Sequence, residues 1–263
     1  MKKYRFMVIG AHPDDPDQMG GGLAMHVVPK GHEVLFLSLT DGGAGHHQMG
    51  REELIARRAQ ERQAAADIYG VTYEALPIPD GELTPSLETR AVLMRKIRTF
   101  APDVIITHRT CDYHPDHRAC GQLVMDCSYL VGVPLYCPDT PVPGKTPVIL
   151  SYHDRFTRPM PFHAEIAIDT DDVIDRKIQG LMAHVSQFYE WLPYVDGWRE
   201  IEAADTFEKK TELLKTFLRT WFTKVADDAR HLLPETVETA EAWEWNEYGA
   251  PMTDDILKVM MEK

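Results

Sequence analysis

The sequence lacks the features that mark disulfide-bonded, membrane-spanning and exported proteins. Its 263 residues include only four cysteines, with no C-x-x-C pair and no zinc-finger spacing, so we expect reduced thiols in or near a core. No apolar run approaches the roughly 20 residues that a transmembrane helix needs. The apolar run before His12 is also too short for an export signal. These absences predict a cytoplasmic protein without a transmembrane segment.

Positive charge is scarce as well. The chain has 28 basic and 41 acidic residues, which give a formal net charge of −13, and no stripe of Lys or Arg interrupts this balance. Most of such a surface repels phosphate groups, which argues against nucleic acid as a partner. The acidic balance suits a protein that binds small neutral ligands or cations. The sequence leaves a homo-oligomer possible.

Strands and helices are predicted to alternate along most of the chain. Short, almost unbroken apolar runs are typical of central parallel strands, and amphipathic stretches separate them. This alternation predicts an α/β fold, a Rossmann-like, doubly wound and mostly parallel sheet with helices on both faces. The expected strands are 4–10, 33–40, 71–78, 104–107, 148–152 and 164–168, and the expected helices are 20–28, 51–69, 86–100, 118–130 and 170–191.

The composition changes after Pro193, where the chain becomes acidic and rich in tryptophan. We interpret residues 1–193 as the main α/β domain. Residues 194–263 are expected to form a C-terminal helical extension packed on it, with helices near 206–229 and 251–262.

The segments richest in chemically active side chains follow three of the predicted strands. They are residues 11–18, 41–50 and 108–117. Because ligands of doubly wound sheets bind at the carboxyl ends of the strands, these segments are expected to open on one edge of the sheet. Motifs that are distant in sequence are thereby predicted to meet in one cleft.

Two similar motifs in these segments indicate a metal site. They are His12-Pro13-Asp14-Asp15 and His114-Pro115-Asp116-His117. A catalytic metal needs about three protein ligands and one open position, and two histidines with one carboxylate meet that need. A lone histidine or aspartate at a strand end is usually structural. However, the first motif is expected by chance in about one chain in a thousand, and its near-copy follows another strand.

The same residues carry a family resemblance. The motifs Ala11–Asp15, Gly20-Gly21-Gly22, Leu39–Gly43, Tyr113–Arg118, Arg58–Glu61 and His184–Gln187 resemble those of the PIG-L/LmbE family of zinc-dependent N-deacetylases over about residues 4–190. The resemblance implies that residues 1–193 are a metal-dependent deacetylase domain. It further implies that His12, Asp15 and His117 bind zinc and that Asp14 is the general base.

The chemistry of the neighbouring side chains is compatible with these roles. Asp14 adjoins a ligand, so its carboxylate can reach a metal-activated water. His114, when protonated, can stabilise the oxyanion and donate a proton to the leaving amine; alternatively it is a fourth ligand. Asp116 either orients His114 or caps the helix that follows.

Four further residues are candidates for substrate binding. From spacing alone, Arg58 and Glu61 form an exposed ion pair on a helix, but the resemblance favours Arg58 as a contact to a substrate hydroxyl or phosphate. It also favours His184 and Gln187 as pocket wall. Asp41 either holds its loop in an Asx turn or contacts substrate.

The predicted function is removal of an N-acetyl or other N-acyl group from an N-acetylglucosamine-type sugar or glycoconjugate, through a metal-activated water. Zn²⁺ is the expected cofactor, although Fe²⁺ or another divalent metal fits the same ligands. The alternative is a non-haem iron oxidoreductase with the same two-histidine, one-carboxylate set. A nucleotide-binding module is disfavoured because no G-x-G-x-x-G follows the first strand. The aromatic residues Tyr189, Trp191, Tyr194 and Trp198 either stack on a sugar or belong to the core.

Overall fold

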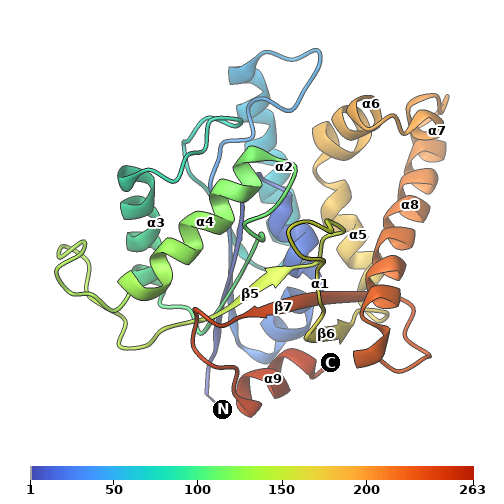
Figure 1. Ribbon diagram of the computed structural model, residues 1–263. Coiled ribbons are helices and arrows are strands. Elements are labelled where there is room, and N and C mark those ends of the chain that lie inside the picture. The colour runs from blue at the N-terminus through green and yellow to red at the C-terminus, as the bar shows by residue number, and fades with distance from the viewer. Residues whose placement is uncertain (1) are drawn as a thin grey trace.

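A seven-stranded sheet in the order β3-β2-β1-β4-β5-β7-β6 forms the centre of the computed structural model, which describes residues 2–263 (Figure 1). The first five strands pair in parallel, whereas β7 runs antiparallel to both β5 and β6. The strands are β1 (Arg5–Gly10), β2 (Glu33–Ser38), β3 (Thr72–Ala75), β4 (Val104–Thr107), β5 (Val148–Tyr152), β6 (Ile166–Asp169) and β7 (Ala240–Asn246). The predicted α/β fold with a mostly parallel sheet is confirmed.

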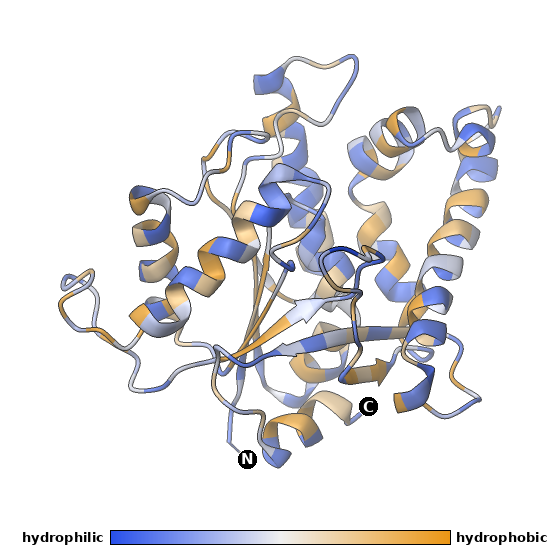
Figure 2. Ribbon diagram, in the orientation of Figure 1, coloured by the Kyte–Doolittle hydropathy of each residue, from blue (hydrophilic) through white to orange (hydrophobic). Residues whose placement is uncertain are grey.

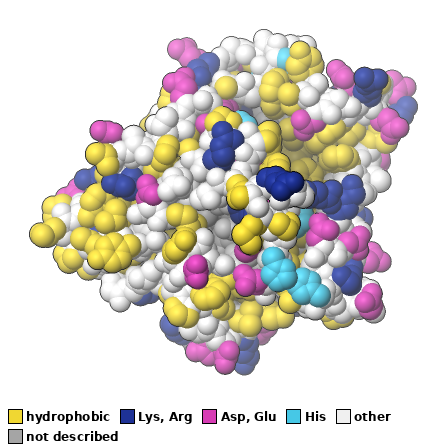
Figure 3. Space-filling model, viewed as in Figure 1, with side chains coloured by type: hydrophobic (Ala, Val, Ile, Leu, Met, Phe, Trp, Pro, Cys, Tyr) yellow, Lys and Arg dark blue, Asp and Glu magenta, His cyan; other side chains and the backbone are white. Residues whose placement is uncertain are grey.

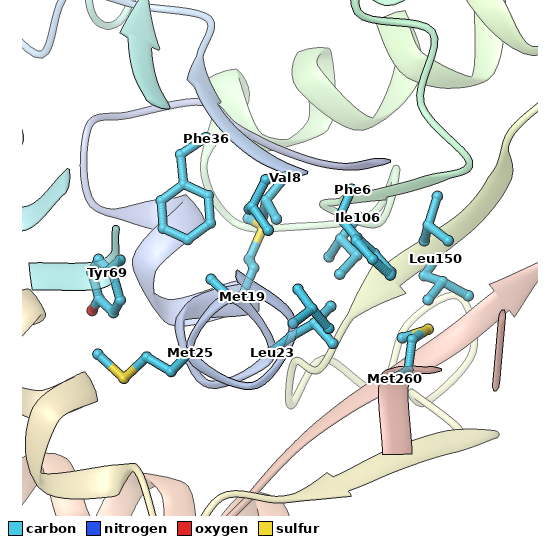
Figure 4. Packing of buried hydrophobic residues seen from close by; sticks show 14 of the residues in the cluster. Phe6, Val8, Met19, Leu23, Met25, Phe36, Tyr69, Ile106, Leu150 and Met260 are labelled. Atoms are coloured by element: carbon cyan, nitrogen blue, oxygen red, sulfur yellow. The ribbon is translucent and has the colours of Figure 1, made fainter. Parts of the chain in front are cut away.

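Helices cover both faces of the sheet, as predicted. Alternate strand residues point to opposite faces, so Phe6 and Val8 join one apolar cluster with α1 and α2, while Met7 and Ile9 join another with α3 and α4. Figure 4 shows the first cluster, where strand side chains lie against α1 and Met260 of α9. The helices are α1 (Asp15–Val27), η1 (Val28–Lys30), α2 (Arg51–Tyr69), α3 (Leu87–Phe100), α4 (Pro115–Leu130), α5 (Ile174–Met182), η2 (Ser186–Trp191), α6 (Leu192–Val195), α7 (Arg199–Glu202), α8 (Phe207–Asp228), η3 (Arg230–Leu232) and α9 (Asp254–Met261). In Figure 2 the outer helices carry hydrophilic residues next to hydrophobic ones, as expected of helices with one buried face.

The C-terminal part of the chain differs from the prediction because it is not wholly helical. Helices α8 and α9 agree with those expected near 206–229 and 251–262, but residues 240–246 form β7 between β5 and β6. Ala242 and Trp243 of this strand are fully buried. The extension therefore completes the central sheet. The division at residue 193 stays a prediction.

The single helix expected over 170–191 is also divided. Helix α5 ends at Met182, and a π-helical segment, η2, begins at Ser186. The Ser186 N–H donates to Oε1 of Glu61 at 2.9 Å, and its hydroxyl donates to Oε2 at 2.6 Å. The Glu61 carboxylate of α2 thus accepts a backbone hydrogen bond at the point where the α-helix changes to a π-helix. An inserted side chain is a common cause of such a change.

Two predictions made from absences can be compared with the structure. No helix within residues 2–263 is long and apolar enough to cross a membrane. All four cysteines are free thiols, and Cys120, Cys127 and Cys137 are buried. The expectation of cysteines in the core is confirmed for these three residues, and that of reduced thiols stays a prediction.

Candidate active site

One cavity of about 780 Å³ opens at the carboxyl edge of the sheet. The segments after β1, β2 and β4 all contribute to its lining, as predicted, and residues 152–156 at the end of β5 add a further side. The motif residues His12, Asp14, Asp15 and His117 lie among the lining residues. The two motifs therefore meet in one cleft.

His12, Asp15 and His117 form a compact set of possible metal ligands. Nδ1 of His12 lies 3.5 Å from Oδ2 of Asp15, and Nε2 of His117 lies 3.7 Å from Oδ1 of Asp15. The remaining nitrogen of each imidazole is held by another carboxylate. Nε2 of His12 lies 3.3 Å from both Asp80 and Asp116, and Nδ1 of His117 lies 3.1 Å from Asp112.

This arrangement fits a divalent metal. A metal-binding histidine usually has its second nitrogen held by a carboxylate or carbonyl, which orients the ring. Here that condition is met twice, and the free nitrogens both face Asp15. Three overlapping groups offer ligand atoms within 4.8 Å of one another, namely His12, His114 and His117; Asp15, His108 and His117; and His12, Asp80 and Asp116.

The charges around His12 favour a cation. Burial alone would lower the pKa of His12, but the carboxylates of Asp116, Asp15 and Asp80 outweigh it and raise that pKa well above its usual value. Burial likewise opposes ionisation of Asp15, yet neighbouring His117 and His108 hold its pKa well below the ordinary range. A proton or a metal ion would neutralise the same carboxylates.

Asp14 is buried and held by Arg58. Nη2 of Arg58 donates to Oδ1 of Asp14 at 2.7 Å and to the carbonyl of Pro13 at 2.9 Å, and Nη1 donates to the carbonyl of Gly42 at 3.2 Å. Burial raises the pKa of Asp14, while the Arg58 guanidinium opposes that rise. The prediction from spacing of an exposed Arg58–Glu61 ion pair is wrong, because Arg58 is only 1% exposed. Arg58 also lines the cavity, so its role as a contact to a substrate hydroxyl or phosphate stays a prediction.

His114 and Asp116 adopt different partners from those predicted. Nδ1 of His114 accepts the Asp116 N–H at 3.2 Å, which leaves Nε2 to carry the proton of the neutral ring. Burial and the neighbouring His12 and His117 lower the pKa of His114. The Asp116 carboxylate accepts from the Gly81 N–H at 2.7 Å and lies against His12. The expectation that Asp116 orients His114 is therefore wrong, and Asp116 orients His12 instead.

The remaining predicted residues divide between the cavity and its surroundings. Gln187 lines the cavity, and its Oε1 has no partner within residues 2–263. His184 is fully buried beneath the cavity wall, where Nε2 lies 3.1 Å from Oδ1 of Asp17, so the prediction that it lines the pocket is wrong. Oδ1 of Asp41 accepts from the N–H groups of Gly43 at 2.9 Å and Asp80 at 3.1 Å. Asp41 thus forms the Asx turn that was its alternative role.

Three residues of the site were not predicted. Nε2 of His108 lies 3.1 Å from Oδ2 of Asp15, and burial lowers the pKa of His108 to about 4. Asp112 holds His117, and Asp80 holds His12. Despite burial, which opposes ionisation, the contact with His12 lowers the pKa of Asp80 to about 2. His108 and Asp112 lie in a segment expected to reach the cleft, whereas no motif marked Asp80.

Aromatic side chains form the outer wall of the cavity. The wall residues are Trp191, Trp198, Phe217 and Trp221 on one side and Tyr113 and Phe156 on the other. The rings of Trp198 and Phe217 lie 4.2 Å apart. Figure 3 shows hydrophobic side chains around the hollow in the upper right of this face. Of the aromatic cluster noted in the sequence, Trp191 and Trp198 reach the cavity, Tyr189 is buried, and Tyr194 stacks on His47 at 4.0 Å.

Comparison with known proteins agrees with this fold. Residues 7–128 match the model of the PIG-L family, described as GlcNAc-PI de-N-acetylase. The matched part of the chain, which carries both motifs, is thus similar to the PIG-L family.

The proteins to which the chain is similar include enzymes of more than one kind. The chain is 29% identical over 202 residues to a diacetylchitobiose deacetylase of Thermococcus kodakarensis, covering 73% of this chain and 74% of the relative. It is 23% identical over 197 residues to a 4-oxalmesaconate hydratase of Pseudomonas putida, covering 72% and 76%. The structure of an N,N'-diacetylchitobiose deacetylase from Pyrococcus horikoshii has the same fold, with a TM-score of 0.74, 23% identity and coverage of 93% of this chain and 84% of that one.

Proposed function

We propose that this protein is a divalent-metal-dependent deacetylase that hydrolyses the N-acetyl group of an N-acetylglucosamine-type sugar or glycoconjugate. The observation that carries the proposal is the buried Asp14 carboxylate, held by Arg58 at 2.7 Å and next in the chain to Asp15, which lies 3.5 Å from His12 and 3.7 Å from His117. We infer zinc as the metal, because two imidazoles and one carboxylate are the protein ligands of many catalytic zinc sites. The relative from Thermococcus supports the reaction.

The residues of the chain divide the work of amide hydrolysis. A metal held by His12, Asp15 and His117 would supply Lewis acidity and lower the pKa of water. Asp14 accepts the proton of the water that attacks the amide carbon, and this proton passes to the nitrogen as the carbon–nitrogen bond breaks. His114, with its proton on Nε2, donates a hydrogen bond to the oxygen on which charge develops. Acetate and a free amine are the products.

The charges of the cavity favour an amino sugar over the polycarboxylate that a hydratase would bind. Six aspartates and four cationic side chains line the cavity. Three of these cations are already paired: Arg58 contacts Asp14, Arg109 contacts Asp154 at 3.0 Å and Glu244 at 3.3 Å, and Arg155 lies 4.0 Å from Asp228. A substrate with several carboxylates would be repelled, whereas a neutral sugar and its cationic amine product suit this surface. The aromatic outer wall suits the apolar faces of sugar rings.

The oxidoreductase alternative is not supported by the comparisons, since the relatives named above are deacetylases and a hydratase. The buried Asp14, placed beside the ligand set, also suits activation of water better than activation of oxygen. We expect turnover to be the same with and without oxygen or 2-oxoglutarate.

A substrate panel tests the proposal. Zinc-loaded protein is incubated with N-acetylglucosamine, its methyl glycoside and N,N'-diacetylchitobiose, and the released amine and acetate are measured. We expect the two products in equal amounts. The protein without metal is the control. A zinc-bound protein that releases amine from none of these sugars, or whose activity disappears without oxygen, would contradict the proposal.

Replacing Arg58 with methionine is expected to lower kcat/KM at neutral pH by about 10- to 100-fold. This loss is smaller than the full contribution of a general base, because Asp14 itself is kept. The Arg58 guanidinium opposes the burial that raises the pKa of Asp14, so its loss raises this pKa further. Because the base works only when deprotonated, activity is then lost at a higher pH as the solution is acidified. The pH dependence of kcat/KM measures this shift.

The neighbouring variant Arg57→Met provides the matched control. Arg57 donates to Glu61 at 2.9 Å and to Glu190 at 2.6 and 2.8 Å, so its loss removes ion pairs of the same helix without touching Asp14. We expect this control to keep the wild-type pH profile. If Arg58→Met also kept it, Arg58 would not set the state of Asp14.

A further inference from the structure

Helix α1 is opened at one point between the metal-site residues and the rest of the helix. Gly20 has non-helical dihedral angles, φ −151° and ψ 16°. In a regular α-helix the Gly22 N–H would donate to the carbonyl of Gln18, and the Leu23 N–H to the carbonyl of Met19. In this protein each of these four backbone groups contacts a side chain from α5 or β7.

The contacts are short and come from three residues. Glu241 of β7 accepts both N–H groups: Oε1 from Gly22 at 2.6 Å and Oε2 from Leu23 at 2.9 Å. Lys177 of α5 donates to the carbonyl of Gln18 at 2.9 Å. Trp243 of β7 donates through Nε1 to the carbonyl of Met19 at 3.0 Å. Two turns of one helix are thus joined through side chains of distant elements.

Burial makes this arrangement specific. Lys177, Glu241 and Trp243 are all fully buried. Lys177 also forms an ion pair with Glu241 at 2.6 Å and lies 3.6 Å from the centre of the Phe222 ring. A buried charge is tolerated only when it is paired and hydrogen-bonded, so neither charged residue can move without the other. A Cβ at Gly22 would lie 3.0 Å from Oε1 of Glu241 and 2.7 Å from Thr170, which explains the glycine at this position.

The turn that is held in this way belongs to the candidate active site. It carries the metal-ligand candidate Asp15 and also Gln18, whose Nε2 lies 3.5 Å from Oδ2 of Asp14. Because the helix is opened at Gly20, the position of this turn depends on the side chains that bind its carbonyl groups.

We propose that Glu241, Lys177 and Trp243 are positioning residues that fix the first turn of α1 and thereby the geometry of Asp14 and Asp15. This inference rests on the proposed metal-dependent function. None of the three residues touches the site, and two of them come from a strand more than 200 residues away in the chain.

Two variants test the inference. Glu241→Asp keeps the charge that Lys177 needs but shortens the reach to Gly22 and Leu23, and Trp243→Phe removes a single hydrogen bond to Met19. For each we expect the dissociation constant for Zn²⁺ to rise by about 10-fold, the effect typical of residues that orient metal ligands. We also expect kcat to fall while KM for the best substrate of the panel stays within about two-fold. Titration calorimetry with Zn²⁺ alone measures the first effect independently of activity.

The control separates positioning from stability. Arg98 is 3% exposed and donates to several carbonyl groups between residues 130 and 140, far from α1 in the fold. Arg98→Met is expected to lower the melting temperature while leaving zinc affinity and kcat unchanged below that temperature. Should Glu241→Asp not fold, Trp243→Phe decides the question.

The outcomes distinguish the two proposals. Wild-type zinc affinity and kcat in the folded variants would overturn the positioning role and leave the proposed function intact. The same would follow if Arg98→Met weakened zinc binding as much as the test variants at equal loss of melting temperature. A wild-type protein that binds no zinc would overturn the proposed function and this inference with it.

Discussion

Replacing Asp14 with asparagine is expected to abolish amide hydrolysis and to leave the metal bound. Asparagine has nearly the same shape as aspartate, but its amide cannot accept a proton from water. The expected loss in kcat is about 10²- to 10⁴-fold, the contribution of a general base. Because Asp14 contacts Arg58 and Gln18 rather than the ligand histidines, the affinity for Zn²⁺ should stay close to that of the wild type. Amine release and zinc titration measure the two effects separately.

The exposed carboxylate of Asp67 offers a control for this substitution. It lies on α2, where it accepts from Gln63 at 2.8 Å, and Asp67→Asn should retain both activity and metal. A zinc-bound Asp14→Asn variant with the wild-type rate would show that another group takes the proton.

Replacing His117 with alanine is expected to remove both the metal and the activity. His117 contributes Nε2 to the set around Asp15, and its loss also leaves the Asp112 carboxylate without its partner at 3.1 Å. We expect zinc affinity to fall by more than the roughly 100-fold that marks the loss of an orienting residue. Amine release should then be undetectable. Metal content after dialysis and zinc titration measure this loss.

His163 serves as the control, since it stacks on His231 at 5.6 Å and does not line the cavity formed by residues 2–263. His163→Ala should keep the metal. If His117→Ala also kept a full complement of zinc, the ligands would come from a group without His117, of which the structure offers His12 with Asp80 and Asp116.

The parts of the fold that depend on local sequence were predictable. The strands β1, β2 and β4 are buried between two layers of helices. Because both of their faces are buried, their sequences are unbroken apolar runs, which the sequence shows directly. The cleft followed from topology, because parallel strands end on the same edge. The motif at His12 and the motif at His114 were therefore expected to meet.

The parts that depend on long-range contacts were not predictable. The partner of Arg58 is Asp14, 44 residues earlier in the chain, while the spacing on the helix suggested Glu61. The same holds for His184, whose hydrogen-bond partner Asp17 lies 167 residues earlier in the chain. Asp80 follows β3 and the two prolines Pro77 and Pro79, and only the folded chain shows that it faces His12. Strand β7 was missed because the residues around it indicated helices.

The place of β7 in the sheet has a consequence for synthesis of the protein. Strand β6 pairs with β7 alone, and β7 lies between β5 and β6 although it is made more than seventy residues after β6. Domains form from the N-terminus as the chain leaves the ribosome. Strands β1 to β5 can therefore assemble while β6 is still unpaired, because β7 has not yet been synthesised. Completion of the sheet, and with it the support that β7 gives to α1, then falls in the final stage of translation.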